Sequence, residues 1–194
     1  MLILLIAQGS WYAFPFYLEI EKGLATNVAG LILLTPTVLM MICGPLAGFL
    51  SDRVGARPIC IIGSAFFITA FLMFAFMGTK TGLYYVSIAL VLEGIGIGLT
   101  MPANFNQIMG MSAKGDEGVI NSLVNTVRNV GAVTGIATFT LIFLSVIASK
   151  GISTANITAH SLPPSAFTLG FHAIFLFGAV LGSVLLVLNL ALRK

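Results

Sequence analysis

Two ionisable side chains, Glu93 and Arg128, lie inside long apolar stretches of the sequence. Helical spacing places Asn104 on one stripe with Glu93, and Asn121 and Asn125 on one face with Arg128. A charge at membrane depth costs about 2.5–3.5 kcal/mol, and such residues commonly mark ion or substrate pathways. These five residues are therefore candidates for a proton or substrate pathway.

The carboxyl group of Glu93 has two interpretations. It could bind and release a proton or hold a cation, or it could be a structural group, either ion-paired or protonated and hydrogen-bonded. Glu93 and Arg128 stand at similar depths from the end that their helices share, so we expect them to approach each other or share a water-filled cavity. Their pairing would then either change during a transport cycle or simply neutralise both charges.

Small residues accompany both charged positions. Glycines thin a helix and let its neighbour approach closely, which stabilises helix pairs in membranes. We therefore predict tight helix packing around both charged side chains. The residues concerned are Gly94, Gly96, Gly98, Gly131 and Gly135.

Composition sets the class of protein. The chain has 194 residues, of which 58% are hydrophobic and only 8% charged, and its mean hydropathy is +1.08. Soluble domains carry about 25% charged residues, so the solvent for this chain must be a lipid bilayer. A bilayer core needs about 20 apolar residues per helix. We predict an all-α, polytopic membrane protein, a single bundle over residues 1–194 with helices at about 2–18, 28–50, 58–78, 83–107, 118–148 and 169–192.

The basic residues outside the spans favour one orientation. Because cytoplasmic loops carry an excess of Lys and Arg, we expect the C-terminus to be cytoplasmic and the protein to lie in the plasma membrane. The side predicted to be cytoplasmic carries five basic residues, Arg53, Arg57, Lys114, Arg193 and Lys194. The opposite side carries three, Lys22, Lys80 and Lys150.

Other classes of function find no support in the sequence. The two cysteines and two histidines are isolated, so no metal site is expected. No catalytic triad, phosphate-cradling loop or dinucleotide fingerprint is present, which argues against an enzyme and against a cofactor. The net charge of +3 is too small and dispersed to suggest nucleic acid.

A polar stretch between the second and third predicted spans carries a family resemblance. The run Gly48-Phe-Leu-Ser-Asp52-Arg53-Val-Gly55-Ala-Arg57 closely resembles the signature loop of the major facilitator superfamily, Gly-x-Leu-x-Asp-Arg-x-Gly-x-Arg. In that family the loop joins the second and third helices of a six-helix half, on the cytoplasmic side. The residues around 15–18, 29–36 and 118–135 look like the C-terminal half of the fourteen-helix drug:proton antiporter branch.

The resemblance implies secondary active transport, namely proton-coupled efflux of small organic compounds or drugs by alternating access. The partners it implies are protons, a small-molecule substrate, the lipid bilayer, and either an N-terminal transporter half or a second copy of the chain. The chain would then be a fragment or a half-transporter. The alternative is a membrane scaffold or sensor subunit that transports nothing.

The signature loop also has a physical interpretation. Gly48 and Gly55 permit a sharp turn and close helix approach, and Asp52 could cap a helix or pair with Arg57. By resemblance, such a network latches one bundle to the other in the outward-facing state. The alternative is that it only fixes the topology of the loop during membrane insertion.

Overall fold

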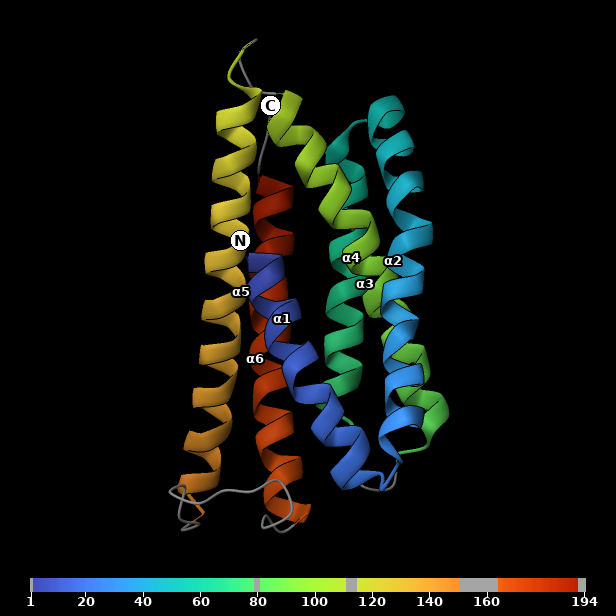
Figure 1. Ribbon diagram of the computed structural model, residues 1–194, viewed down its shortest axis with the longest axis vertical. Helices are drawn as coiled ribbons and strands as arrows, with labels where there is room; N and C mark the ends of the chain where they lie inside the picture. Colours follow the sequence, from blue (N-terminus) through green and yellow to red (C-terminus); the bar gives the residue numbers. More distant parts are fainter. Residues whose placement is uncertain (1, 79–80, 111–114, 151–163, 192–194) are drawn as a thin grey trace.

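A computed structural model describes residues 2–78, 81–110, 115–150 and 164–191 (Figure 1). All the long elements in this part of the chain are helices, which confirms the predicted all-α fold. The elements are α1 (Leu2–Phe16), the π-helical turn η1 (Tyr17–Glu21), α2 (Thr26–Val54), α3 (Ala56–Ala75), α4 (Leu83–Gly110), α5 (Glu117–Ala148) and α6 (Pro164–Ala191).

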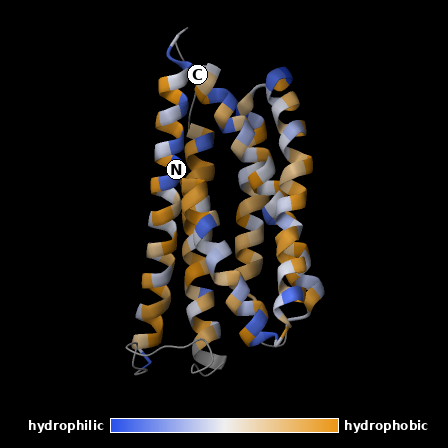
Figure 2. Ribbon diagram, in the orientation of Figure 1, coloured by the Kyte–Doolittle hydropathy of each residue, from blue (hydrophilic) through white to orange (hydrophobic). Residues whose placement is uncertain are grey.

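Five helices in the described part of the chain, α2 to α6, are long and apolar enough to cross a membrane. Figure 2 shows hydrophobic positions along most of their length. The α1 helix has 15 residues and continues into the 5 residues of η1. The α1 helix alone is shorter than the roughly 20 residues that a bilayer core requires.

The helix ends gather at two ends of the bundle (Figure 1). The Asp52 end holds the junction of α2 and α3, the end of α4 and the start of α5. The Glu21 end holds η1, the start of α2 and the junction of α3 and α4. Four of the basic residues used to predict the orientation lie outside the described residues, namely Lys80, Lys114, Arg193 and Lys194.

The polar turn expected over residues 51–57 is much shorter than predicted. The α2 helix continues to Val54 and α3 begins at Ala56, so Gly55 alone breaks the helices. Its φ of 89° lies in the region that favours glycine. No side chain caps α3, so the first of the two roles predicted for Asp52, capping a helix, is not found at α3.

Helices that follow each other in the chain are not always packed together. The α4 helix packs closely on α2 and α3, whereas α1 packs on α5 and α6, and α3 joins the two groups by packing on α6. The α4 and α5 helices barely touch. The bundle therefore consists of two three-helix groups, α2–α3–α4 and α1–α5–α6.

An aromatic core holds the two groups together. Phe14 of α1, Phe74 of α3 and Phe175 of α6 are fully buried, and their ring centroids lie 4.5–5.2 Å apart. Aromatic pairs at such distances contribute about 0.5–1.5 kcal/mol beyond the area that they bury. These rings therefore pack α1, α3 and α6 against one another.

Candidate transport site

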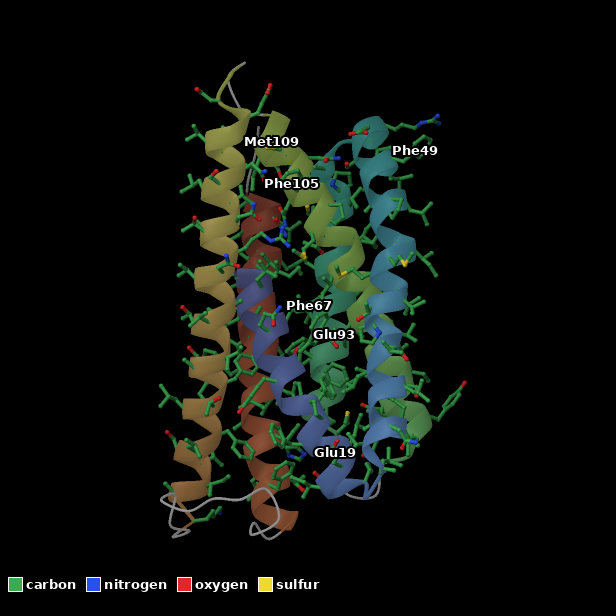
Figure 3. The ribbon with its side chains drawn as sticks, viewed as in Figure 1. Glu19, Phe49, Phe67, Glu93, Phe105 and Met109 are labelled. Atoms are coloured by element: carbon green, nitrogen blue, oxygen red, sulfur yellow. The ribbon has the colours of Figure 1, made fainter. Side chains whose placement is uncertain are left out.

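Glu93 lies in the interior of the bundle, near the middle of α4 (Figure 3). Its side chain is fully buried. One carboxyl oxygen, Oε1, accepts a hydrogen bond of 3.1 Å from the Ser10 hydroxyl of α1. The Ser10 hydroxyl is also buried and lies 2.8 Å from the Ala7 carbonyl oxygen, so a single serine connects the carboxyl group to the α1 backbone.

The other carboxyl oxygen of Glu93 and the indole nitrogen of Trp11 are both buried, and neither has a hydrogen-bond partner among the described residues. Trp11 follows Ser10 on α1, and its indole N–H lies near the same carboxyl group, within reach of a hydrogen bond to it although outside strict hydrogen-bond geometry. A buried polar group without a partner costs about 1–3 kcal/mol. The site therefore holds an unused acceptor beside an unused donor.

The glycines beside Glu93 bring α4 against both of its neighbours. A Cβ atom at Gly94 would lie 2.7 Å from the Cα of Pro36 in α2, and one at Gly96 would lie 2.8 Å from the backbone nitrogen of Phe67 in α3. A Cβ atom at Gly98 would lie 2.9 Å from the Cβ of Cys43 in α2. On α5, a Cβ at Gly135 would collide with the backbone of Leu5, whereas Gly131 is simply buried.

The structure does not bring Glu93 and Arg128 together, which corrects the expected approach. Arg128 is exposed to a cavity of about 910 Å³ that Asn104 and Asn121 also line, whereas Glu93 does not line it. The physical reason is that α4 and α5 belong to different three-helix groups. A similar depth along two helices implies a contact only when those helices pack.

The three asparagines of the predicted pathway have distinct surroundings. The Oδ1 atom of Asn104 lies 3.5 Å from the Sγ of Cys60 in α3, which can donate to it. The Oδ1 of Asn121 accepts a 3.4 Å hydrogen bond from the Nδ2 of Asn125. Asn125 does not line the cavity with Arg128.

The signature loop is tied to its own bundle. Asn106 of α4 donates from Nδ2 to the Asp52 carboxylate at 3.3 Å and to the Ser51 hydroxyl at 2.9 Å. Arg57 donates to the last carbonyls of α6 instead of pairing with Asp52, with Nε lying 3.4 Å from the Asn189 oxygen. A positive charge near helix carbonyls at a C-terminus is favourable.

Two other positions of the loop face outwards. The Arg53 guanidinium lies 4.3 Å from the centroid of the Phe49 ring, one turn earlier on α2. A Cβ atom at Gly48 would meet nothing within 4 Å. The close helix approach expected at Gly48 is therefore not found within the described residues.

A polar cluster at the Glu21 end was not anticipated. Glu21 accepts a 3.0 Å hydrogen bond from the Thr168 hydroxyl of α6, and its burial raises the pKa of that carboxyl group. Lys22 donates to the Thr81 carbonyl oxygen at 2.6 Å, and His172 contacts the Met77 carbonyl oxygen at the same distance. Helical periodicity gave no signal for this cluster, because its members come from three separate segments.

In the described ranges, no group of three His, Cys, Asp or Glu side chains could hold a metal ion.

Comparison with known proteins identifies the class. The sequence profile of the Major Facilitator Superfamily matches residues 1–194. The chain belongs to this family of transporters and is an integral membrane protein.

Individual relatives are named as transporters. The riboflavin transporter RibZ of Clostridioides difficile (strain 630) is 30% identical over 132 residues, which are 68% of this chain and 29% of that protein. The multidrug transporter protein MdtP of Bacillus subtilis (strain 168) is 25% identical, over 63% of this chain and 23% of its own length. The multidrug efflux pump LfrA of Mycolicibacterium smegmatis is 23% identical, over 79% of this chain and 31% of that protein. The chain thus spans less than a third of the length of each of these three relatives.

Proposed function

We propose that this chain forms one six-helix bundle of a secondary transporter that exports small organic compounds in exchange for protons by alternating access. The observation that carries the proposal is the Glu93 carboxyl group, which is fully buried in a membrane bundle and accepts a hydrogen bond from the neutral hydroxyl of Ser10. Two of the relatives described above are named for multidrug transport or efflux. The substrate path would lie between this bundle and a second one.

Glu93 is suited to carry the proton because only neutral donors, and no cation among the described residues, stabilise its charge. No cationic side chain in the described part of the chain contacts the carboxyl group, and an isolated buried carboxylate is costly. A bound proton removes that charge. When the carboxyl group releases its proton, the carboxylate would need new contacts with water or with substrate. Forming those contacts would move α1 relative to α4, so that protonation and conformation change together.

The signature loop would supply the conformational latch. Asp52 and Arg57 fix the junction of α2 and α3 to α4 and α6. Arg53 has no hydrogen bond to the described residues and faces outwards over Phe49. We infer that Arg53 contacts the other bundle in one state of the cycle and releases it in another.

The test uses the complete transporter in cells or proteoliposomes. Efflux of a fluorescent organic compound is measured with and without a protonophore, in the wild type and in Glu93→Gln. We expect the protonophore to abolish wild-type efflux, and Glu93→Gln, which keeps the shape but cannot release a proton, to abolish gradient-driven efflux. Glu19→Gln, at the Glu21 end of the bundle, is the control and should transport normally. Efflux that persists in the protonophore, or that Glu93→Gln leaves intact, would refute proton coupling through this residue.

A further inference from the structure

The indole ring of Trp11 connects the buried carboxyl group of Glu93 to the surface of the bundle. Its Nε1 atom is buried and lies near that carboxyl group without a hydrogen bond of strict geometry. The ring as a whole is only partly buried and packs against the apolar core. A single side chain of α1 therefore reaches both Glu93 and the surface of this bundle.

The two unpaired polar atoms, Trp11 Nε1 and Glu93 Oε2, are enclosed by this chain itself. Both atoms are buried within the bundle. The α2 and α3 helices close tightly on α4 next to Glu93, at Gly94 and Gly96. A second bundle cannot reach either atom without displacing this packing, so each atom must find its partner inside this bundle.

Only neutral groups face the carboxyl group of Glu93 among the described residues. The α1 helix contributes the Ser10 hydroxyl and the Trp11 indole. At the glycines beside Glu93, α2 contributes Pro36 and α3 contributes Phe67. None of these four side chains titrates, so a change of charge at this site comes from Glu93 alone.

The number of hydrogen-bond donors that Glu93 needs depends on its proton. A neutral carboxyl group carries a donor of its own, whereas a carboxylate only accepts, and it does so at both oxygens. The Ser10 hydroxyl serves Oε1, which leaves Oε2. The indole N–H of Trp11 is the unused buried donor near this carboxyl group, and it can only donate. A hydrogen bond to a charged acceptor is shorter and about twice as strong as a neutral one, so ionisation of Glu93 draws the indole towards it.

We propose that Trp11 is a positioning residue that responds to the proton on Glu93. When the proton leaves, the indole N–H closes on the carboxylate, and when the proton returns, the indole relaxes to the loose arrangement of this structure. Because part of the ring reaches the surface, its movement carries the protonation state of a buried group to the surface of α1. This inference rests on the proposed function, since it names how the same site is regulated, but its test measures hydrogen bonding and ionisation rather than transport.

The experiment uses the full-length protein in lipid discs, with a heavy nitrogen isotope in its tryptophan indoles. Trp11 is the only tryptophan in this sequence, so this bundle contributes one indole N–H resonance, identified by its loss in Trp11→Phe. Ionisation of Glu93 is followed separately, through the infrared carbonyl band of its protonated carboxyl group, identified by its loss in Glu93→Gln. As pH rises, we expect the Trp11 resonance to move downfield while this band disappears, because the hydrogen bond becomes stronger.

Two variants and a control separate positioning from packing. In Glu93→Gln, the Trp11 resonance should not change with pH. In Trp11→Phe, which keeps an aromatic ring but removes the donor, Glu93 should release its proton at a pH about one unit higher, which is a tenfold tighter hold on the proton. Tyr12→Phe, which alters the exposed neighbouring ring on α1, should leave both the Trp11 resonance and the release of the proton unchanged.

A Trp11 resonance that does not respond while Glu93 ionises would overturn this inference alone and leave proton coupling intact. Release of the proton at the wild-type pH in Trp11→Phe would do the same, because water rather than the indole would then stabilise the carboxylate. A pH response that persists in Glu93→Gln would also overturn it. A carboxyl band that never disappears while the protein stays folded would overturn both this inference and the proposed function. If Trp11→Phe does not fold, the comparison of the wild type with Glu93→Gln still tests the proposal, since one indole resonance must move in the first and stay in the second.

Discussion

The Ser10 hydroxyl donates a hydrogen bond of 3.1 Å to the carboxyl group of Glu93, joining residues that are 83 positions apart in the chain. Ser10 belongs to the α1–α5–α6 group and Glu93 to the α2–α3–α4 group. The bond therefore forms a polar link at mid-bundle between two groups that are otherwise joined mainly by apolar packing of α3 on α6. A change in the protonation of Glu93 acts directly on this link.

Ser10→Ala should destabilise the bundle because it leaves the Glu93 oxygen without a buried donor. We expect a loss of about 1–3 kcal/mol in the free energy of unfolding, measured by denaturant unfolding in detergent. Ser122→Ala is a matched control, since the Ser122 hydroxyl is exposed and bonds only to its own helix at Gly118. Equal stability of the two variants would show that the link contributes nothing.

Gly94→Ala should lower the stability of the protein, although it adds only one methyl group. The added methyl group would lie 2.7 Å from the Pro36 backbone, which cannot rotate away. Overpacking of this kind costs about 1–3 kcal/mol, so we expect a clear fall in melting temperature. Gly118→Ala, where an added Cβ meets nothing within 4 Å, should leave the melting temperature unchanged or raise it. Equal melting temperatures of Gly94→Ala and Gly118→Ala would contradict the close packing of α4 on α2.

Asp52→Asn should remove the negative charge of the signature loop without disturbing the fold. The substituted amide oxygen can still accept from Asn106, so thermal stability should stay within about 0.5 kcal/mol of the wild type. If the loop is a latch that depends on charge, transport by the complete protein should fall and cysteine probes should label the opposite face differently. Unchanged transport together with unchanged labelling would leave the loop only a structural role.

Glu21 should make stability depend on pH. Glu21 lies beyond the predicted span 2–18, near Lys22 and His172, and burial is the largest cause of its raised pKa. Because the folded state holds the proton more tightly than the unfolded state, this contribution is complete below the ordinary pKa of 4.5 and is lost as pH rises through the higher folded value. Glu21→Gln should flatten melting temperature against pH over that window, whereas Glu19→Gln should not. An identical slope in the wild type and Glu21→Gln would contradict the prediction.

Several features followed from the sequence because they depend on local composition and spacing. Lipid as the solvent, the existence of all six helices and the identity of the signature loop needed only apolar run lengths and one short motif. The burial of Glu93 also followed from the sequence. Three glycines next to it on an apolar helix predict that other helices pack closely around this carboxyl group. The helix ends were less accurate, because α2 and α3 continue through polar residues until Gly55 interrupts them.

The partners of the functional residues were decided by the tertiary structure alone. Glu93 contacts Ser10 rather than Arg128, because α4 packs between α2 and α3 while α5 packs on α1. Arg57 reaches the end of α6 rather than Asp52. Helical periodicity fixes which face a side chain occupies, but not which helix covers that face. That choice depends on the packing of all six helices together, which no short stretch of sequence contains.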